Sequence, residues 1–169
     1  ELAEVARGRR VVLVTSGAVA LGAEKLGLVR QKGKRWDIPT KQAAAAVGQP
    51  LLMAAWGEAL GAHGLVTGQV LLTADDLASR RRFLNARRTF ERLLDEGAVP
   101  VVNENDTVAV EEIKVGDNDT LAALVAGCVE ADAVVMLTDV EGLYDRSPSL
   151  PGAELLREVA RVTPEVERI

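Results

Sequence analysis

Four short apolar runs place the strongest limit on what this chain can fold into. They are RVVLV (residues 10–14), LVTGQVLLT (65–73), AVPVV (98–102) and AVVML (133–137). The first is rich in β-branched residues and too apolar for a strand with one face in water, which is typical of a strand buried on both faces. The four runs therefore predict the strands of a largely buried sheet.

Segments with helical spacing separate these runs. Helices are expected over TSGAVALGAEKLG and over residues 40–62, 83–96 and 119–129. Within the second of these, Gly48 and Pro50 predict a break, and Gly97 is a typical stop for the third. Strands that alternate with helices predict an α/β layered fold with a mainly parallel sheet.

The bulk composition excludes several classes of protein. The chain has 169 residues without internal repeats or a dividing linker, which fits one domain over residues 1–169. Its net charge of −5 argues against non-specific nucleic-acid binding, which needs a basic face. No apolar run approaches the roughly 20 residues of a membrane span, and no signal peptide is visible. The single Cys128 suits a reducing compartment, so we expect a cytoplasmic location.

Polar clusters follow three of the predicted strands. TSGA follows residues 10–14, NEND follows residues 98–102, and TDVEG follows residues 133–137. In parallel sheets, ligands bind outside the carboxyl ends of the strands. Three polar clusters at one edge therefore predict a binding site there.

The first cluster, Thr15 to Ala18, joins a strand to a helix. The free N–H groups of the first helical turn favour an anion, small residues let it approach the backbone, and Ser16 adds a hydroxyl donor. The alternative is that Ser16 only caps the helix. A P-loop is excluded because the chain lacks GxxxxGK[ST], and GxGxxG is also absent.

The other clusters also have two interpretations each. Asn103 to Asp106 offers amides and carboxylates for an ammonium or carboxylate group, or else forms an exposed Asx-type turn. Asp117 to Asp119 precedes a helix and contains candidate N-caps, but the sequence does not continue as a calcium-binding EF-hand loop. Thr138 and Asp139 suit a nucleotide's base or ribose, or plain turn chemistry.

The remaining side chains supply no nucleophilic machinery. With one His63 and one Cys128, the chain has no credible Ser/His/Asp or Cys/His arrangement and no His/Cys metal cluster. His63 is expected at the surface, and Cys128 in a packed helix. An enzyme with this inventory needs a reaction in which the protein positions and neutralises charge, and phosphoryl transfer is such a reaction.

Six segments, in this order, resemble the amino acid kinase family. They are VVLVTSGAVALG, KQAAAAVGQPLLM, GQVLLT, RRRFLNARRTFERLL, VPVVNENDTVAVEEIKVGDNDTLAALVA and VVMLTDVEGLYDRSP. The resemblance covers nearly the whole chain, and FLNAR, NEND and KVGDND are specific to the members that phosphorylate free glutamate. It implies a three-layer αβα sandwich around a mainly parallel sheet, incomplete at both ends.

The resemblance also implies an activity and roles for matching residues. The activity is ATP-dependent phosphorylation of the γ-carboxylate of L-glutamate, the first step of proline biosynthesis, with Mg2+ bound through ATP. The residues expected to bind glutamate are Ser16, Gly17, Ala18, Asn103, Asp106 and Asn118. Asp119 would organise the catalytic lysines, and Thr138 and Asp139 would contact ATP. No residue is assigned to a metal.

This sequence departs from the family pattern in its lysines. The family has a catalytic lysine on its first strand and a second one in a Gly-rich segment, and neither Lys41 nor Lys114 occupies those positions. We therefore expect the chain to be the central portion of a longer kinase domain and to have little activity by itself, because those cations neutralise the reacting phosphates.

Two alternatives remain, together with expectations about partners. The chain could be another amino acid kinase, of the acetylglutamate or aspartate type, or a non-catalytic glutamate or proline sensor. The resemblance further implies feedback inhibition by proline and a homo-oligomer. The stretch between NEND and GDND, residues 107–115, is expected to form an arm over the pocket.

Overall fold

The structure is a computed structural model that describes residues 1–29, 36–109 and 118–169. It divides into two units, Glu1–Val134 and Val135–Ile169, each of which is described by itself. Most of the predicted arm over residues 107–115, together with Asp117, lies outside the described residues.

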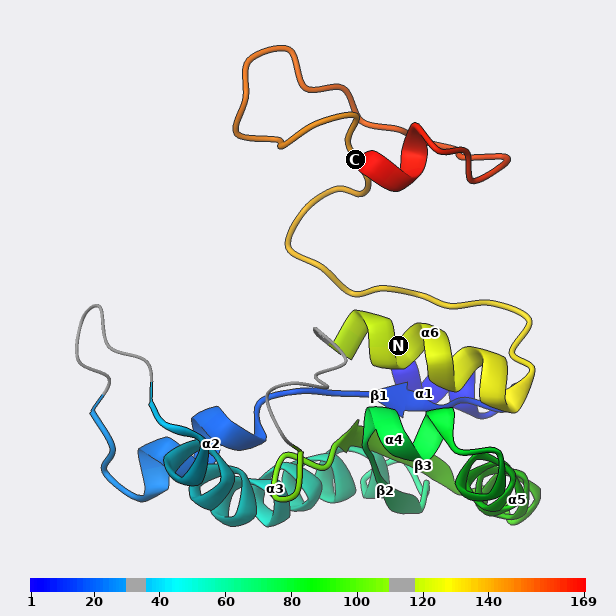
Figure 1. Cartoon of the computed structure of the whole chain (residues 1–169). Helices are drawn as coiled ribbons and strands as arrows, with labels where there is room; N and C mark the ends of the chain where they lie inside the picture. The colour runs from blue at the N-terminus through cyan, green and yellow to red at the C-terminus, as the bar shows by residue number, and fades with distance from the viewer. Residues whose placement is uncertain (30–35, 110–117) are drawn as a thin grey trace. The chain divides into compact units, whose positions relative to one another are not determined.

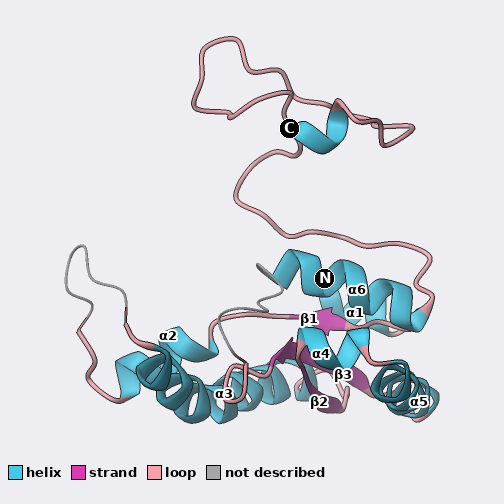
Figure 2. Cartoon of the chain, viewed as in Figure 1, coloured by secondary structure: helices cyan, strands magenta, loops and turns pink. Residues whose placement is uncertain are grey.

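The first unit is built on a parallel three-stranded sheet. Its strands are β1 (Leu13–Val14), β2 (Thr67–Leu72) and β3 (Val99–Glu104), in the order β1-β3-β2. Figure 2 shows the three strands together with helices around them. The register pairs Val14 with Val102 and Val70 with Val102, so β3 is the central strand.

Helices cover both faces of this sheet. They are α1 (Leu2–Ala6), α2 (Ala18–Lys25), α3 (Ile38–Gly61), α4 (Ala74–Ala78), α5 (Arg80–Asp95) and α6 (Asn118–Val129). One apolar cluster joins Val70 and Val102 to α5 and α6 through Phe90 and Leu121. A second cluster joins Val99 to α1 and α3 on the other face. Because alternate strand residues point to opposite faces, the sheet lies between two helical layers, as the predicted αβα class requires.

The predicted strand over residues 10–14 is shortened to Leu13–Val14, and Pro100 explains why. Odd-numbered residues of β3 direct their N–H groups toward β2, since Val99 N donates to Val66 O and Asn105 N donates to Leu72 O. Residue 100 therefore faces β1, where a parallel ladder needs an N–H group for the carbonyl of Val11. Proline has none, so the regular pairing begins at Leu13.

The prediction of a break near Gly48 and Pro50 is wrong, because α3 runs unbroken over 24 residues. Pro50 cannot donate to the carbonyl of Ala46, but both residues are exposed, so water can reach that carbonyl. The Ala-rich sequence favours the helix. Despite the length of α3, no helix in the described ranges is both long and apolar enough to cross a membrane.

The predicted strand over residues 133–137 is also wrong. This segment forms no strand, and Val135 and Leu137 are 79% and 90% exposed. A β-branched apolar sequence adopts a stable strand only when a neighbouring strand supplies backbone partners. None of the described strands pairs with these residues, so the sheet has three strands instead of four.

The second unit contains little regular structure, in agreement with the loop expected over GLYDRSPSLPG. Tyr144 and Leu155 form an isolated antiparallel bridge, and a 3-10 helix covers Val166–Arg168. The Asp145 carboxylate accepts from the Glu154 backbone N–H and pairs with Arg146. The Arg146 contact, followed by the Glu154 bond, lowers the pKa of Asp145.

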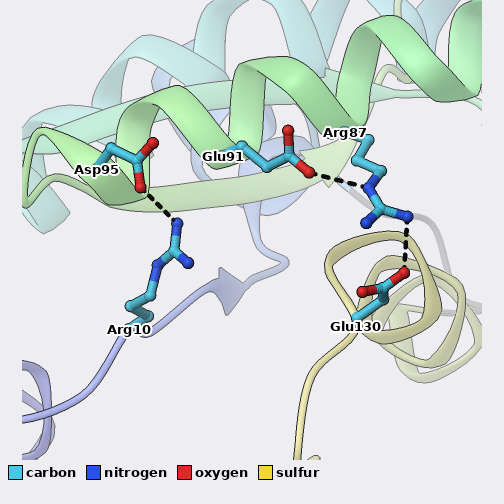
Figure 3. A network of polar contacts seen from close by, with 5 residues as sticks. All are labelled: Arg10, Arg87, Glu91, Asp95 and Glu130. Atoms are coloured by element: carbon cyan, nitrogen blue, oxygen red, sulfur yellow. Dashed lines mark hydrogen bonds and ion pairs between the residues drawn. The ribbon is translucent and has the colours of Figure 1, made fainter.

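Ion pairs connect α5 to a residue just before β1 and to the residue after α6 (Figure 3). Arg10, just before β1, contacts Asp95 at 2.8 Å, and Arg87 contacts both Glu91 at 3.0 Å and Glu130 at 2.8 Å. The two carboxylates raise the pKa of Arg87. All of these side chains reach solvent, so each pair adds only about 0–1 kcal/mol. They connect Glu130, just after α6, to α5, and the packing of Phe90 and Leu121 supplies most of the stability.

Helices α2 and α3 lie side by side in unusually close contact (Figure 1). A Cβ atom added to Gly48 would collide with the backbone carbonyl of Ala18, and one added to Gly22 would collide with that of Ala44. Both glycines are buried. The absence of these two side chains therefore sets the position of α2, whose N-terminus begins at the edge of the sheet.

We predict that Gly48→Ala lowers the free energy of unfolding by about 2 kcal/mol or more, because the methyl group meets backbone atoms that cannot rotate away. Gly57→Ala in the same helix is the matched control. Its Cβ would lie 3.6 Å from Thr67 Oγ1, an ordinary contact, so the substitution should stabilise the helix by about 0.5–1 kcal/mol. Urea denaturation measures both, and equal effects would contradict the close packing of α2 on α3.

Candidate active site

The carboxyl ends of β1 and β3 bring two of the predicted clusters together. Val14 pairs with Val102, so Thr15, which follows β1, lies beside Asn103, which still belongs to β3 and pairs with Leu71 of β2. The predicted NEND cluster therefore begins within the last two residues of β3. A cavity of about 730 Å³ opens at this edge. Its lining residues are Ser16, Gly17, Ala18, Val19, Ala20, Ala23, Glu24, Leu28, Trp36, Asn103, Glu104, Asp106 and Asn118.

The N-terminus of α2 forms one wall of the cavity. Gly17 is its N-cap, with a φ of 112° that favours glycine, and no side chain caps the first turn. By contrast, Asp37 caps α3, and a Thr73–Asp76 capping box caps α4. The interpretation of Ser16 as the helix cap is therefore wrong. The first-turn N–H groups of α2 can serve a bound anion instead.

Thr15 fixes the start of this wall, because three of its hydrogen bonds reach other strands and helices. Its N–H donates to Val102 O at 2.9 Å, and its carbonyl accepts from Asn118 Nδ2 at 2.6 Å. Its hydroxyl accepts from the indole Nε1 of Trp56 at 3.2 Å. These bonds connect the end of β1 to β3, α6 and α3. They therefore fix the position of the backbone from which Ser16 and Gly17 continue.

Asn103 lines the cavity and is only 3% exposed. Its Oδ1 accepts from the Glu104 N–H at 2.9 Å and from Asn118 Nδ2 at 3.4 Å, and its Nδ2 donates to Gln49 Oε1 at 3.0 Å. A buried amide is costly unless its polar atoms find partners. Here both ends of the amide are bonded to protein groups.

The NEND segment contains residues with different surroundings. Asn105 makes the local turn, since its carbonyl accepts from the N–H groups of Val108 and Ala109, and its side chain accepts from Thr107. Asp106 and Glu104 instead line the cavity. The turn is thus closed by the backbone carbonyl of Asn105 and not by an Asx-type side-chain bond to the backbone, and Asn103 and Asp106 line the cavity.

The cavity brings together all six residues that the family resemblance assigned to substrate binding, from Ser16 to Asn118. Asp119, assigned to organising catalytic lysines, is the next residue of α6, is exposed and does not line the cavity. Thr138 and Asp139 belong to the second unit, where the Val140 N–H donates to the Thr138 hydroxyl at 3.4 Å. Their cluster follows no strand, contrary to the sequence prediction.

The sequence of the chain was compared with models of known protein families. The model of the amino acid kinase family matches residues 1–166. The chain belongs to the amino acid kinase family.

Several similar proteins, all named glutamate 5-kinase, support this membership. A glutamate 5-kinase of Anaeromyxobacter dehalogenans is 83% identical over 99% of this chain and 44% of its own length. Glutamate 5-kinases of Myxococcus xanthus and Thermus thermophilus are 59% and 53% identical, over 98% and 99% of this chain. The chain thus spans less than half the length of each of these relatives, at 44%, 44% and 45%.

Several residues that build this candidate site lie outside the polar clusters that the sequence predicts. Trp36 and Glu24 line the cavity, Trp56 holds Thr15, and Gln49 holds Asn103. The sequence shows Gln49 only as a polar residue in an Ala-rich segment, and the structure shows that its side chain is 7% exposed. A buried polar side chain requires partners, and those partners are next to the substrate-binding candidates.

We predict that Thr15→Val lowers the free energy of unfolding by about 1 kcal/mol, because the isosteric valine leaves the Trp56 indole N–H without its acceptor. In a Trp56→Phe background the same change should cost markedly less, since no donor remains. Urea denaturation of the four proteins in this cycle measures the coupling. Equal costs in both backgrounds would show that the bond to Thr15 does not hold the wall.

Proposed function

We propose that this chain binds L-glutamate for an ATP-dependent kinase that phosphorylates the γ-carboxylate and produces L-glutamyl 5-phosphate, the first step of proline biosynthesis. The observation that carries the proposal is the cavity that collects Ser16, Asn103, Asp106 and Asn118 around an uncapped helix N-terminus. The names of the three relatives described above support the same assignment.

The cavity offers complementary groups for an amino acid. The Ser16 hydroxyl and the first-turn N–H groups of α2 are hydrogen-bond donors, which suit a carboxylate. Asp106 is an anion that suits the α-ammonium group. An N-blocked amino acid has no ammonium group, so it could not make this charge-assisted contact with Asp106.

The reaction that we propose needs no side-chain nucleophile. The substrate's γ-carboxylate has a usual pKa near 4.3, so it is ionised at neutral pH without a general base. One of its oxygens attacks the γ-phosphorus of ATP, a new O–P bond forms, the bond to the β–γ bridging oxygen breaks, and ADP leaves with that electron pair. Catalysis then consists of alignment and charge stabilisation.

The nucleotide side of the reaction is assigned on family grounds. Thr138 and Asp139 would contact ATP, and Mg2+ would accompany its phosphates and neutralise part of their charge. Asp119, exposed at the start of α6 and next to Asn118, would orient catalytic lysines toward the phosphoryl group. We also propose a cytoplasmic location, a homo-oligomer, and feedback inhibition by proline, an amino acid with the same α-carboxylate and a charged nitrogen.

The experiment that tests the function compares substrates in the full-length protein. With ATP and Mg2+, L-glutamate should be phosphorylated and N-acetylglutamate and L-aspartate should not. Hydroxylamine trapping of the acyl phosphate, together with ADP release, measures turnover. Activity only with the blocked or shorter substrate would assign the protein to another branch of the family. Binding of glutamate or proline without turnover would favour a sensor.

We predict that Asp106→Ala raises the glutamate KM by about 30-fold or more, because it removes a charge-assisted contact with the ammonium group. The KM for ATP should stay within about two-fold, since Asp106 lies in the glutamate cavity. Asp95→Ala removes an exposed carboxylate that pairs with Arg10 and serves as the control for net charge. An unchanged glutamate KM in Asp106→Ala would overturn the role of Asp106.

A further inference from the structure

A series of four amide side chains runs from β2 to the cavity, and we call it the amide relay. Asn118 Nδ2 donates to Asn103 Oδ1 at 3.4 Å, and Asn103 Nδ2 donates to Gln49 Oε1 at 3.0 Å. Gln49 Nε2 in turn donates to Gln69 Oε1 at 3.4 Å. The relay thus connects α6, β3, α3 and β2, in that order.

Backbone groups fix the direction of the relay. The Glu104 N–H can only donate, so the atom of Asn103 that faces it must be the oxygen. The Thr15 carbonyl can only accept, so the atom of Asn118 that faces it must be the nitrogen. With both asparagines oriented, the Asn103 nitrogen faces α3 and requires an acceptor there.

Gln49 supplies that acceptor from a buried position. It is 7% exposed, and its neighbours Ala45 and Leu52 on α3 are also buried. An apolar residue of the same size would fill the space but would leave the Asn103 N–H without this partner, which is costly in a buried site. Gln69, by contrast, is exposed and can exchange its partner for water.

The relay determines which group Asn118 can offer to a ligand. Its nitrogen is occupied by Thr15 O and Asn103 Oδ1, whereas its Oδ1 accepts no hydrogen bond within the described part of the chain. Asn118 lines the cavity together with Asp106. Both residues therefore present oxygen acceptors, which suit a cationic ammonium group better than a carboxylate.

We propose that Gln49 is a positioning residue for substrate recognition. It holds Asn103, Asn103 holds Asn118, and Asn118 keeps its amide oxygen available for the substrate's ammonium group. The inference rests on the proposed function for the identity of the substrate, but the geometry of the relay does not depend on it.

The test is a double-mutant cycle in the full-length protein, with Gln49→Leu and Asn118→Ala alone and combined. Calorimetric titration gives the Kd for L-glutamate and for ATP. Gln49→Leu should raise the glutamate Kd about ten-fold and leave the ATP Kd within about two-fold, because Gln49 acts through one contact of the amino acid. In the Asn118→Ala background, the same substitution should change the glutamate Kd by less than about two-fold.

Leu52→Ala is the control that distinguishes a loss of positioning from a general loss of stability. This substitution lies one turn further along α3 and truncates a residue with 8% exposure. The apolar Leu52 side chain has no polar atom and makes no hydrogen bond to the relay. It should lower the Tm at least as much as Gln49→Leu does and leave the glutamate Kd near that of the wild type. Equal effects of Gln49→Leu in the wild-type and Asn118→Ala backgrounds would overturn the proposal.

A second readout is independent of the substrate. In protein labelled with ¹⁵N-asparagine, Asn118→Ala identifies the side-chain amide signals of Asn118. Gln49→Leu should shift these signals and speed their proton exchange several-fold, whereas Leu52→Ala should not. Unchanged Asn118 signals in Gln49→Leu would overturn the relay. If the wild-type protein does not bind glutamate but Gln49→Leu still shifts the Asn118 signals, the result contradicts the proposed function and leaves the relay intact.

Discussion

The backbone of Thr15 is the point on which the candidate site depends. Its N–H completes the pairing of β1 with β3, and its carbonyl accepts the 2.6 Å bond from Asn118 at the start of α6. Of the hydrogen bonds that Thr15 makes, this is the one that connects the segment before α2 to the N-terminal end of α6. The parallel register places Thr15 opposite Asn103, one residue beyond the pair of Val14 and Val102. The site is therefore a consequence of strand pairing, and its polar side chains need no long loops to meet.

Two kinds of packing support this edge, and they contribute differently. Apolar burial around Phe90, Leu121 and Val102 supplies most of the free energy that holds the helices to the sheet, at about 1.5–3 kcal/mol for each large side chain. The buried amides of Gln49 and Asn103 add little net stability, because their hydrogen bonds replace bonds to water. Their contribution is orientation, since each amide can satisfy its neighbours in one arrangement only. The contact of Gly22 and Gly48 with facing backbone then sets how closely α2 approaches α3.

Much of this architecture could be predicted from the sequence. The runs over residues 65–73 and 98–102 became β2 and β3, the predicted helices became α2, α3, α5 and α6, and Gly97 has the positive φ of a helix stop. The errors have physical causes that lie outside local sequence patterns. Pro100 acts on the neighbouring strand, the exposure of Pro50 preserves α3, and residues 133–137 find no partner strand among those described. Similarly, Ser16, Asp106 and Asn118 were visible as motifs, whereas Gln49 becomes meaningful only once β3 packs against α3.

The central claim is that the cavity at the carboxyl ends of β1 and β3 holds the amino-acid substrate in one orientation. A crystal structure of the full-length protein with L-glutamate tests it most directly. We expect the ammonium group within hydrogen-bond distance of Asp106 and of the Asn118 amide oxygen, and a carboxylate at the N-terminus of α2 near Ser16. Glutamate bound elsewhere, or bound here with a carboxylate against Asp106, would contradict it.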